Sequence, residues 1–241
     1  MRSIWRTPWG RALGGRARGG RLEGPLLRDI GLVCLAVGVV GLSYGAVAVT
    51  SGFAWWFPVL MGVLVLAASS EFLFVGIIAS GGSPIAALLA GLLVNARHLP
   101  FGLAVPDVLG QGWRGALGAH LMNDETVVFA LAQDEPERKR AAYWLCGLGI
   151  LICWPVGAAL GALLGSVVRD TGALGLDAMF PAVILALILP ALKDRPLRRT
   201  ALAGAALALT VTPFLPAGLP VLLALAALPL FAAKTKKEAM R

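Results

Sequence analysis

Long apolar stretches separated by short polar segments recur along the chain from residue 30 almost to its C-terminus. A membrane-crossing helix needs about 20 largely apolar residues in a row. Five stretches approach or exceed that length, and three shorter ones, interrupted by prolines, follow them. They lie at about 30–49, 57–80, from 85 onward, 115–132 and 141–168, and then at 178–192, 199–213 and 218–233.

The stretches do not alternate between apolar and polar positions, as the strands of a membrane barrel would. The sequence therefore predicts an all-α, polytopic transmembrane helix bundle of seven to eight spans, with short or broken helices. Composition agrees, since 58% of the 241 residues are hydrophobic and only 14% are charged. That is too little charge to cover the surface of a soluble domain of this length.

The net charge of +8 suggests nucleic acid at first, but the positions of the basic residues do not. They form short clusters beside apolar stretches, the pattern of the positive-inside rule. We therefore expect no nucleic-acid partner, cytoplasmic termini and a single transmembrane domain at 29–233, between basic tails at 1–28 (disordered) and 234–241. The internal clusters are Arg138–Arg140 and Lys193–Arg199.

Small residues recur at helical spacing in two stretches. Gly41 and Gly45 lie four apart in the first, and Gly157, Gly161 and Gly165 continue that spacing in the fifth. Such glycines let membrane helices approach closely, either inside one chain or against a partner subunit. The three cysteines show no C-x-x-C spacing, which argues against a disulfide framework or a zinc site.

A few ionisable residues interrupt the apolar stretches. A charged group at the centre of a membrane helix costs about 2.5–3.5 kcal/mol, so these side chains are expected to face the bundle interior or water. They form three groups, in AASSEFLFVG, NARHLPFG and HLMNDETVV. The groups contain Ser70 and Glu71, then Asn95, Arg97 and His98, then His120, Asp124 and Glu125.

Spacing predicts how these groups are arranged on helices. Asn95 and His98 are three apart and would share a face, and His120 and Asp124 are four apart and could interact along one face. Pro100 predicts a helix break beside Arg97. Such broken helices leave backbone groups that can join a site.

Structural alternatives stay open for each group. Arg97 either contacts a substrate or only pairs with Glu71 or Asp124. The two histidines, His98 and His120, either carry protons or only bond backbone carbonyls freed by a helix break. Buried alone, Glu71 is a candidate proton site.

Enzymatic chemistry finds little support. The chain has no H-E-x-x-H motif and no P-loop lysine motif, and Ser83 precedes a proline in a turn. We expect no enzyme activity and no cofactor, and no spacing favours a metal site.

Three blocks carry a resemblance to one family: ASSEFLFVG, LLVNARHLPFG and LMNDETVVFAL, in the family's order and at about its spacing. On these blocks the chain resembles the AzlC family, the large subunit of AzlC/AzlD-type branched-chain amino acid exporters, over about residues 25–235. Two positions depart from the family pattern, because Glu71 stands where members carry Gln and Asn123 where they carry Thr.

The resemblance implies secondary export of branched-chain or other hydrophobic amino acids from a bacterial cell, across its inner membrane, together with a small AzlD-like membrane subunit. An amino acid is a zwitterion and needs both a cation and an anion or carbonyls. Arg97 can bind the carboxylate and Asp124 or Glu125 the ammonium, with Asn95, His98 and Ser70 nearby, while Glu71, His98 or His120 carries the proton. The alternatives are a non-transporting membrane scaffold and a small-solute channel.

Overall fold

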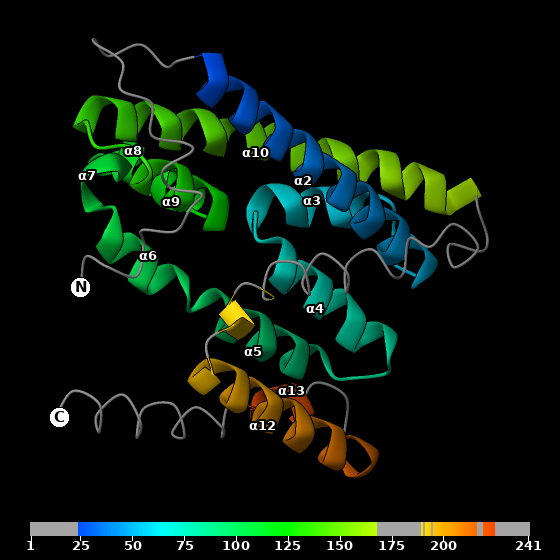
Figure 1. Cartoon of the computed structure of the whole chain (residues 1–241). Helices are drawn as coiled ribbons and strands as arrows, with labels where there is room; N and C mark the ends of the chain where they lie inside the picture. Colours follow the sequence, from blue (N-terminus) through cyan, green and yellow to red (C-terminus); the bar gives the residue numbers. More distant parts are fainter. Residues whose placement is uncertain (1–23, 168–188, 190, 194, 216–218, 225–241) are drawn as a thin grey trace, which may run out of the picture. The chain divides into compact units, whose positions relative to one another are not determined.

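The computed structural model describes residues 24–167, 189, 191–193, 195–215 and 219–224, and every regular element in these ranges is a helix (Figure 1). The all-helical prediction is confirmed there. The helices are α2 (Gly24–Thr50), α3 (Trp56–Leu64), α4 (Ala68–Ala79), α5 (Pro84–Asn95), α6 (His98–Ala104), α7 (Pro106–Leu109), α8 (Gly112–His120), α9 (Asp124–Leu131), α10 (Pro136–Val167), α12 (Arg195–Val211) and α13 (Leu219–Leu223), with short 3-10 turns at Ala191–Lys193 and Thr212–Phe214.

The chain divides into two compact units. The first contains residues 1–68 and 95–171, and the second contains residues 69–94 and 172–241. Most of the predicted stretch 178–192, the end of 218–233 and nearly all of both basic tails lie outside the described residues.

Three helical segments in the described part of the chain are long and apolar enough to cross a membrane: α2, the α5–α6 segment Pro84–Ala104, and α10. The expected seven to eight spans are therefore not confirmed. Helix α2 begins at Gly24, five residues before the predicted start of the membrane domain at residue 29. Pro25 is compatible with that start because the first helical turn needs no backbone N–H from it.

The predicted span 57–80 is wrong as a single helix. Helix α3 ends at Leu64 and α4 begins at Ala68, and between them Leu66 adopts a φ of 50°. A branched side chain rarely adopts this left-handed backbone conformation, and the geometry ends the run of helical hydrogen bonds.

The predicted span 115–132 is also wrong as a single helix, because α8 ends at His120 and α9 begins at Asp124. The stretch from residue 85 onward is interrupted at residues 96–97, between α5 and α6. This break is the one that Pro100 predicts. Pro100 itself lies in the first turn of α6, where its missing N–H would have no helical partner.

Helices α2 and α10 lie side by side over most of their length (Figure 1). A Cβ atom at Gly157 would overlap the carbonyl oxygen of Gly38, and one at Gly165 would lie 2.8 Å from the carbonyl oxygen of Ala46. From Gly157 to Gly165 the contact point on α10 advances by eight residues, and on α2 it also advances by eight, from Gly38 to Ala46. The two helices therefore run parallel.

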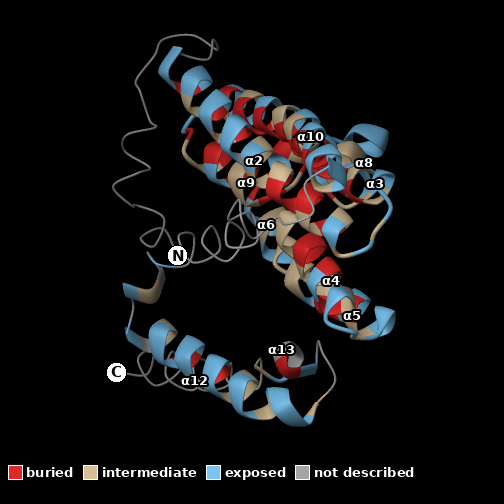
Figure 2. Cartoon of the chain, turned by 90° about the vertical axis from the view of Figure 1, so that its right-hand side faces the viewer, coloured by how far each residue is buried: buried red, intermediate tan, exposed pale blue. Residues whose placement is uncertain are grey.

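The glycines predicted to support close packing therefore form an internal seam. A Cβ at Gly41 would lie 2.7 Å from the carbonyl oxygen of Trp154, and Cβ atoms at Gly45 and Gly161 would overlap the carbonyl oxygens of Ala158 and Leu42. Buried positions concentrate between α2 and α10 (Figure 2). The backbones approach closely here because no side chains separate them.

Trp154 of α10 packs against both α2 and a third helix, α3. Its indole stacks on the ring of Tyr44 from α2, with centroids 5.4 Å apart. On α3, a Cβ at Gly62 would lie 3.0 Å from Cδ1 of the same indole. Helix α3 thus packs on α10 through a glycine as well.

We predict that Gly45→Ala and Gly161→Ala each destabilise the protein by about 1–3 kcal/mol, since the added methyl group meets a backbone carbonyl that moves only if the helices separate. Gly31→Ala on α2 is the matched control, because nothing lies within 4 Å of its Cβ position. Thermal unfolding in detergent measures the difference. Equal midpoints for Gly45→Ala and Gly31→Ala would contradict the seam.

Candidate functional site

The ionisable residues predicted to form a site lie at the helix breaks. Asn95 ends α5, Arg97 is the N-cap of α6 and His98 its first residue. At the second break His120 ends α8, and Asp124 begins α9. Within hydrocarbon, the backbone groups freed at such breaks have no water to bond, so polar residues gather there.

An ion pair joins these two breaks. Nη2 of Arg97 lies 2.9 Å from Oδ2 of Asp124, and the two side chains are 34% and 45% exposed. Both residues belong to the first unit. Asp124 is thus one partner of Arg97 among those the sequence offered. Because the pair is only half buried, its charges are accessible from outside the packed protein.

The capping of α9 fixes the position of Asp124. Oδ1 of Asn123 accepts a hydrogen bond from the backbone N–H of Thr126, at 2.9 Å, and Oγ1 of Thr126 accepts one from the N–H of Asn123, at 2.9 Å. The carboxylates of Asp124 and Glu125 then lie in the first turn of α9, where the helix dipole favours negative charge.

Sequence reasoning missed Thr126, which is fully buried in this capping box. The signal was present as the spacing Asn123-x-x-Thr126, a polar N-cap followed three residues later by a reciprocal partner. It also accounts for one departure from the family pattern. Asn replaces Thr at position 123, and both are favourable N-cap residues.

Arg97 keeps hydrogen-bonding capacity beyond its ion pair. Its Nε is buried and has no hydrogen-bond partner among the described residues. A guanidinium has five N–H donors in a planar fork that matches a carboxylate. The residue is therefore equipped to bind a second anionic group beside Asp124.

Both histidines bond backbone carbonyls at helix ends. Nδ1 of His98 donates to the carbonyl oxygen of Asn95, at 2.8 Å, and Nε2 of His120 donates to that of Val63 near the end of α3, at 2.8 Å. These contacts agree with the alternative in which the two histidines bond backbone carbonyls at a helix break. A pairing of His120 with Asp124 along one helix face is wrong, because the break places them on different helices.

Ser70 and Glu71 belong to the second unit, at the start of α4. Their exposed fractions are 4% and 1%. Helix α5 approaches this position closely through Gly91, whose Cβ would lie 3.7 Å from the carbonyl oxygen of Ser70. Ser83, expected in a turn, caps α5 by accepting a hydrogen bond from the N–H of Ala86, at 3.1 Å.

Metal-site geometry is not found in the described part of the chain, where no three His, Cys, Asp or Glu side chains converge. The three cysteines are free thiols, Cys34 and Cys146 buried and Cys153 half-buried. The candidate site of the first unit is thus an accessible cation beside an accessible anion, with Nη2 of Arg97 2.9 Å from Oδ2 of Asp124.

The sequence profile of the family described as AzlC protein matches residues 32–168, more than half of the chain and the part that holds the Arg97–Asp124 pair. The chain belongs to the AzlC family. The resemblance seen in the three sequence blocks is confirmed. No solved structure matches the chain.

Curated relatives include the branched-chain amino acid transport protein AzlC of Bacillus subtilis, which is 28% identical over 62% of this chain and 60% of its own length. Uncharacterized membrane proteins of Haemophilus influenzae and Archaeoglobus fulgidus are each 30% identical, over 53% and 73% of this chain and 54% and 78% of their own lengths. The chain thus spans little more than half the length of the first two relatives.

We predict that Asn123→Ala destabilises this AzlC-family protein by about 0.5–2 kcal/mol, because the N–H of Thr126 loses its acceptor at the start of α9. Asn123→Thr and Asn123→Ser are the matched controls, since both keep a capping oxygen. Unfolding midpoints in detergent distinguish them. If all three variants unfold alike, the capping box does not hold α9 in place.

Proposed function

We propose that the chain is the large subunit of a secondary transporter that exports branched-chain or other hydrophobic amino acids. The observation that carries the proposal is the half-exposed ion pair of Arg97 and Asp124, which joins two helix breaks. The name of the Bacillus relative supports the substrate class. Pairing with a small AzlD-like subunit rests on family membership.

The pair suits a zwitterion by simple exchange of charges. The substrate carboxylate binds the exposed part of the Arg97 guanidinium, and the substrate ammonium binds Asp124. One ion pair becomes two, so the net charge of the site stays zero throughout. In a medium of low dielectric this avoids leaving an unpaired charge, which would be far more costly.

Further polar groups complete the proposed site. Glu125 follows Asp124 in the first turn of α9, and Asn95 and His98 flank Arg97. Apolar residues of the surrounding helices accommodate the aliphatic side chain of the substrate.

Proton coupling is assigned to Glu71, His98 or His120. Glu71 is the first of these, because its carboxyl side chain is only 1% exposed within an apolar helix. Each histidine donates one ring N–H to a backbone carbonyl, so its other ring nitrogen is the one proposed to accept a proton.

The parallel seam supports the proposed topology in the inner membrane. Because α2 and α10 run in the same direction, Arg28 and the cluster Arg138–Arg140 lie at the same ends of parallel helices. The positive-inside rule assigns that side to the cytoplasm. An odd number of crossings must then connect Thr50 to Pro136, and the three interrupted apolar stretches between them satisfy this.

A scaffold is the main alternative, because the ion pair and the two histidines also stabilise helix ends. The two functions respond differently to reversal of the pair. Arg97→Asp combined with Asp124→Arg restores both stability and activity if the pair only holds helices together. In a transporter it restores stability alone, since the substrate is bound in one orientation.

We predict that Arg97→Ala and Asp124→Asn each lower valine efflux at least about tenfold, the loss expected for one charge-assisted hydrogen bond. Cells loaded with a valine-containing dipeptide provide the assay, at matched expression. Arg28→Ala and Asp29→Asn are the controls, because these residues form another Arg–Asp pair, at 3.4 Å, outside the proposed site. Normal efflux from both site variants would refute the assignment.

We predict that Glu71→Gln, which introduces the residue of the family pattern, abolishes the dependence of efflux on a pH gradient while leaving exchange of amino acids intact. A neutral amide keeps the shape of the carboxyl group but carries no proton. Efflux from proteoliposomes with and without the gradient measures this, with Glu137→Gln, at an exposed position in the first turn of α10, as the control. If the variant depends on the gradient as strongly as the natural protein does, the proton is carried by a group other than Glu71.

A further inference from the structure

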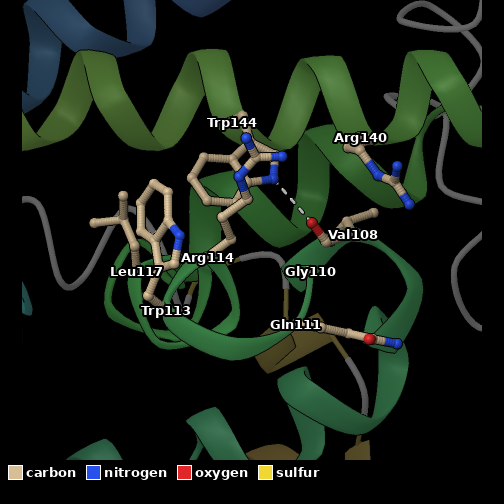
Figure 3. A pocket seen from close by; sticks show the side chains of 8 residues that line it. All are labelled: Val108, Gly110, Gln111, Trp113, Arg114, Leu117, Arg140 and Trp144. Carbon is tan, nitrogen blue, oxygen red and sulfur yellow. Dashed lines mark hydrogen bonds between the residues drawn. The ribbon is translucent and has the colours of Figure 1, made fainter.

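A cavity in the first unit is lined by neither residue of the ion pair. It has a volume of about 620 Å³ and lies between the start of α10 and the segment that contains α7 and α8 (Figure 3). Arg140 and Trp144 line it from α10, and Arg114 and Trp113 from the first turn of α8. The remaining lining residues are Val108, Gly110, Gln111 and Leu117.

The charges on this cavity have one sign. Arg114 and Arg140 are among its lining residues, and no carboxylate is. Nη2 of Arg140 donates to the backbone carbonyl of Asp107, at 3.0 Å, and among the described residues Arg140 forms no ion pair. In the described part of the chain the Arg114 side chain has no hydrogen bond or ion pair, and its guanidinium lies 5.6 Å from the ring centroid of Trp113. The cavity therefore favours an anion.

Backbone groups add to this preference. The N-cap of the nine-residue helix α8 is Gln111, whose side chain makes no capping hydrogen bond. The first-turn N–H groups of α8 thus have no side-chain acceptor and carry the positive end of the helix dipole beside Arg114. On the other wall, Nε1 of Trp144 donates to the carbonyl oxygen of Val108, at 2.9 Å, which fixes the indole in place (Figure 3).

The depth of the cavity in the bilayer identifies the kind of anion. Arg140 is the last charged residue of α10 before an uninterrupted uncharged stretch from residue 141 to 167. Trp113 is 72% exposed, and tryptophans at such boundaries lie at the level of lipid headgroups. The cavity is thus at the membrane interface, where phosphodiester groups are the abundant anions.

We propose that this cavity binds the phosphodiester headgroup of an anionic phospholipid, with Arg114 and Arg140 on the phosphate and the indoles of Trp113 and Trp144 beside the glycerol backbone. Arginine forks match phosphate oxygens, and basic pockets at the ends of membrane helices are a common way of holding such lipids. A bound lipid joins α8 to α10 at one end of the first unit.

Native mass spectrometry of the delipidated full-length chain, titrated with phosphatidylglycerol, tests the proposal. Arg114→Gln combined with Arg140→Gln is expected to weaken binding about 30-fold, from roughly fivefold for each cation near a lipid phosphate. Arg114→Lys combined with Arg140→Lys keeps the charges and is expected to retain most of the affinity. Phosphatidylcholine, which has no net charge, is expected to bind weakly to all forms.

The charge-matched control is Arg28→Gln combined with Lys139→Gln, which also removes two cations but changes no residue that lines the cavity. Equal weakening in this control would overturn the proposal, because the affinity would then follow total charge alone. Glycerol 3-phosphate distinguishes the two sources of phosphate. Binding of this soluble probe as tight as that of phosphatidylglycerol would also overturn the lipid assignment. Unfolding midpoints without lipid verify that every variant is folded.

Discussion

An interrupted helix inside a membrane leaves N–H and C=O groups without helical partners, and hydrocarbon supplies none. Three apolar stretches of this chain are interrupted in this way, and polar residues satisfy backbone groups at each of the three breaks. The carbonyl near the end of α3 accepts from His120, that of Asn95 accepts from His98, and Asn123 caps α9. The positions of these polar residues follow from the need to satisfy the backbone.

The same breaks bring together the two charges proposed to bind substrate. Arg97 and Asp124 each stand at the start of a short helix, and their pairing links two breaks that are far apart in the sequence. Structure and function therefore draw on the same residues, and loss of activity alone does not separate them. Exchanging Arg97 and Asp124 separates the two roles, because the swapped pair keeps its mutual attraction but presents its charges to the substrate in the opposite order.

Around these breaks, a seam of small residues supplies a rigid frame. Glycines at 45, 157 and 161 allow α2 and α10 to meet backbone to backbone, and α10 also contacts α3 and α9. An uninterrupted helix of 32 residues thus holds elements that are themselves short. In the proposed transport, movement is expected at the breaks, where helical hydrogen bonds are already missing, and not along the seam.

Sequence alone determined the membrane class, the family, the glycines of the seam and the residues that carry charge into apolar stretches. These features depend on composition and local spacing, which need no knowledge of packing. It did not reveal that the predicted spans at 57–80 and 115–132 are interrupted, because hydropathy does not register the left-handed backbone of Leu66 or the capping box at Asn123. Only the tertiary structure decided that Arg97 meets Asp124 and that His120 bonds Val63, since such contacts depend on how separate helices approach one another in space.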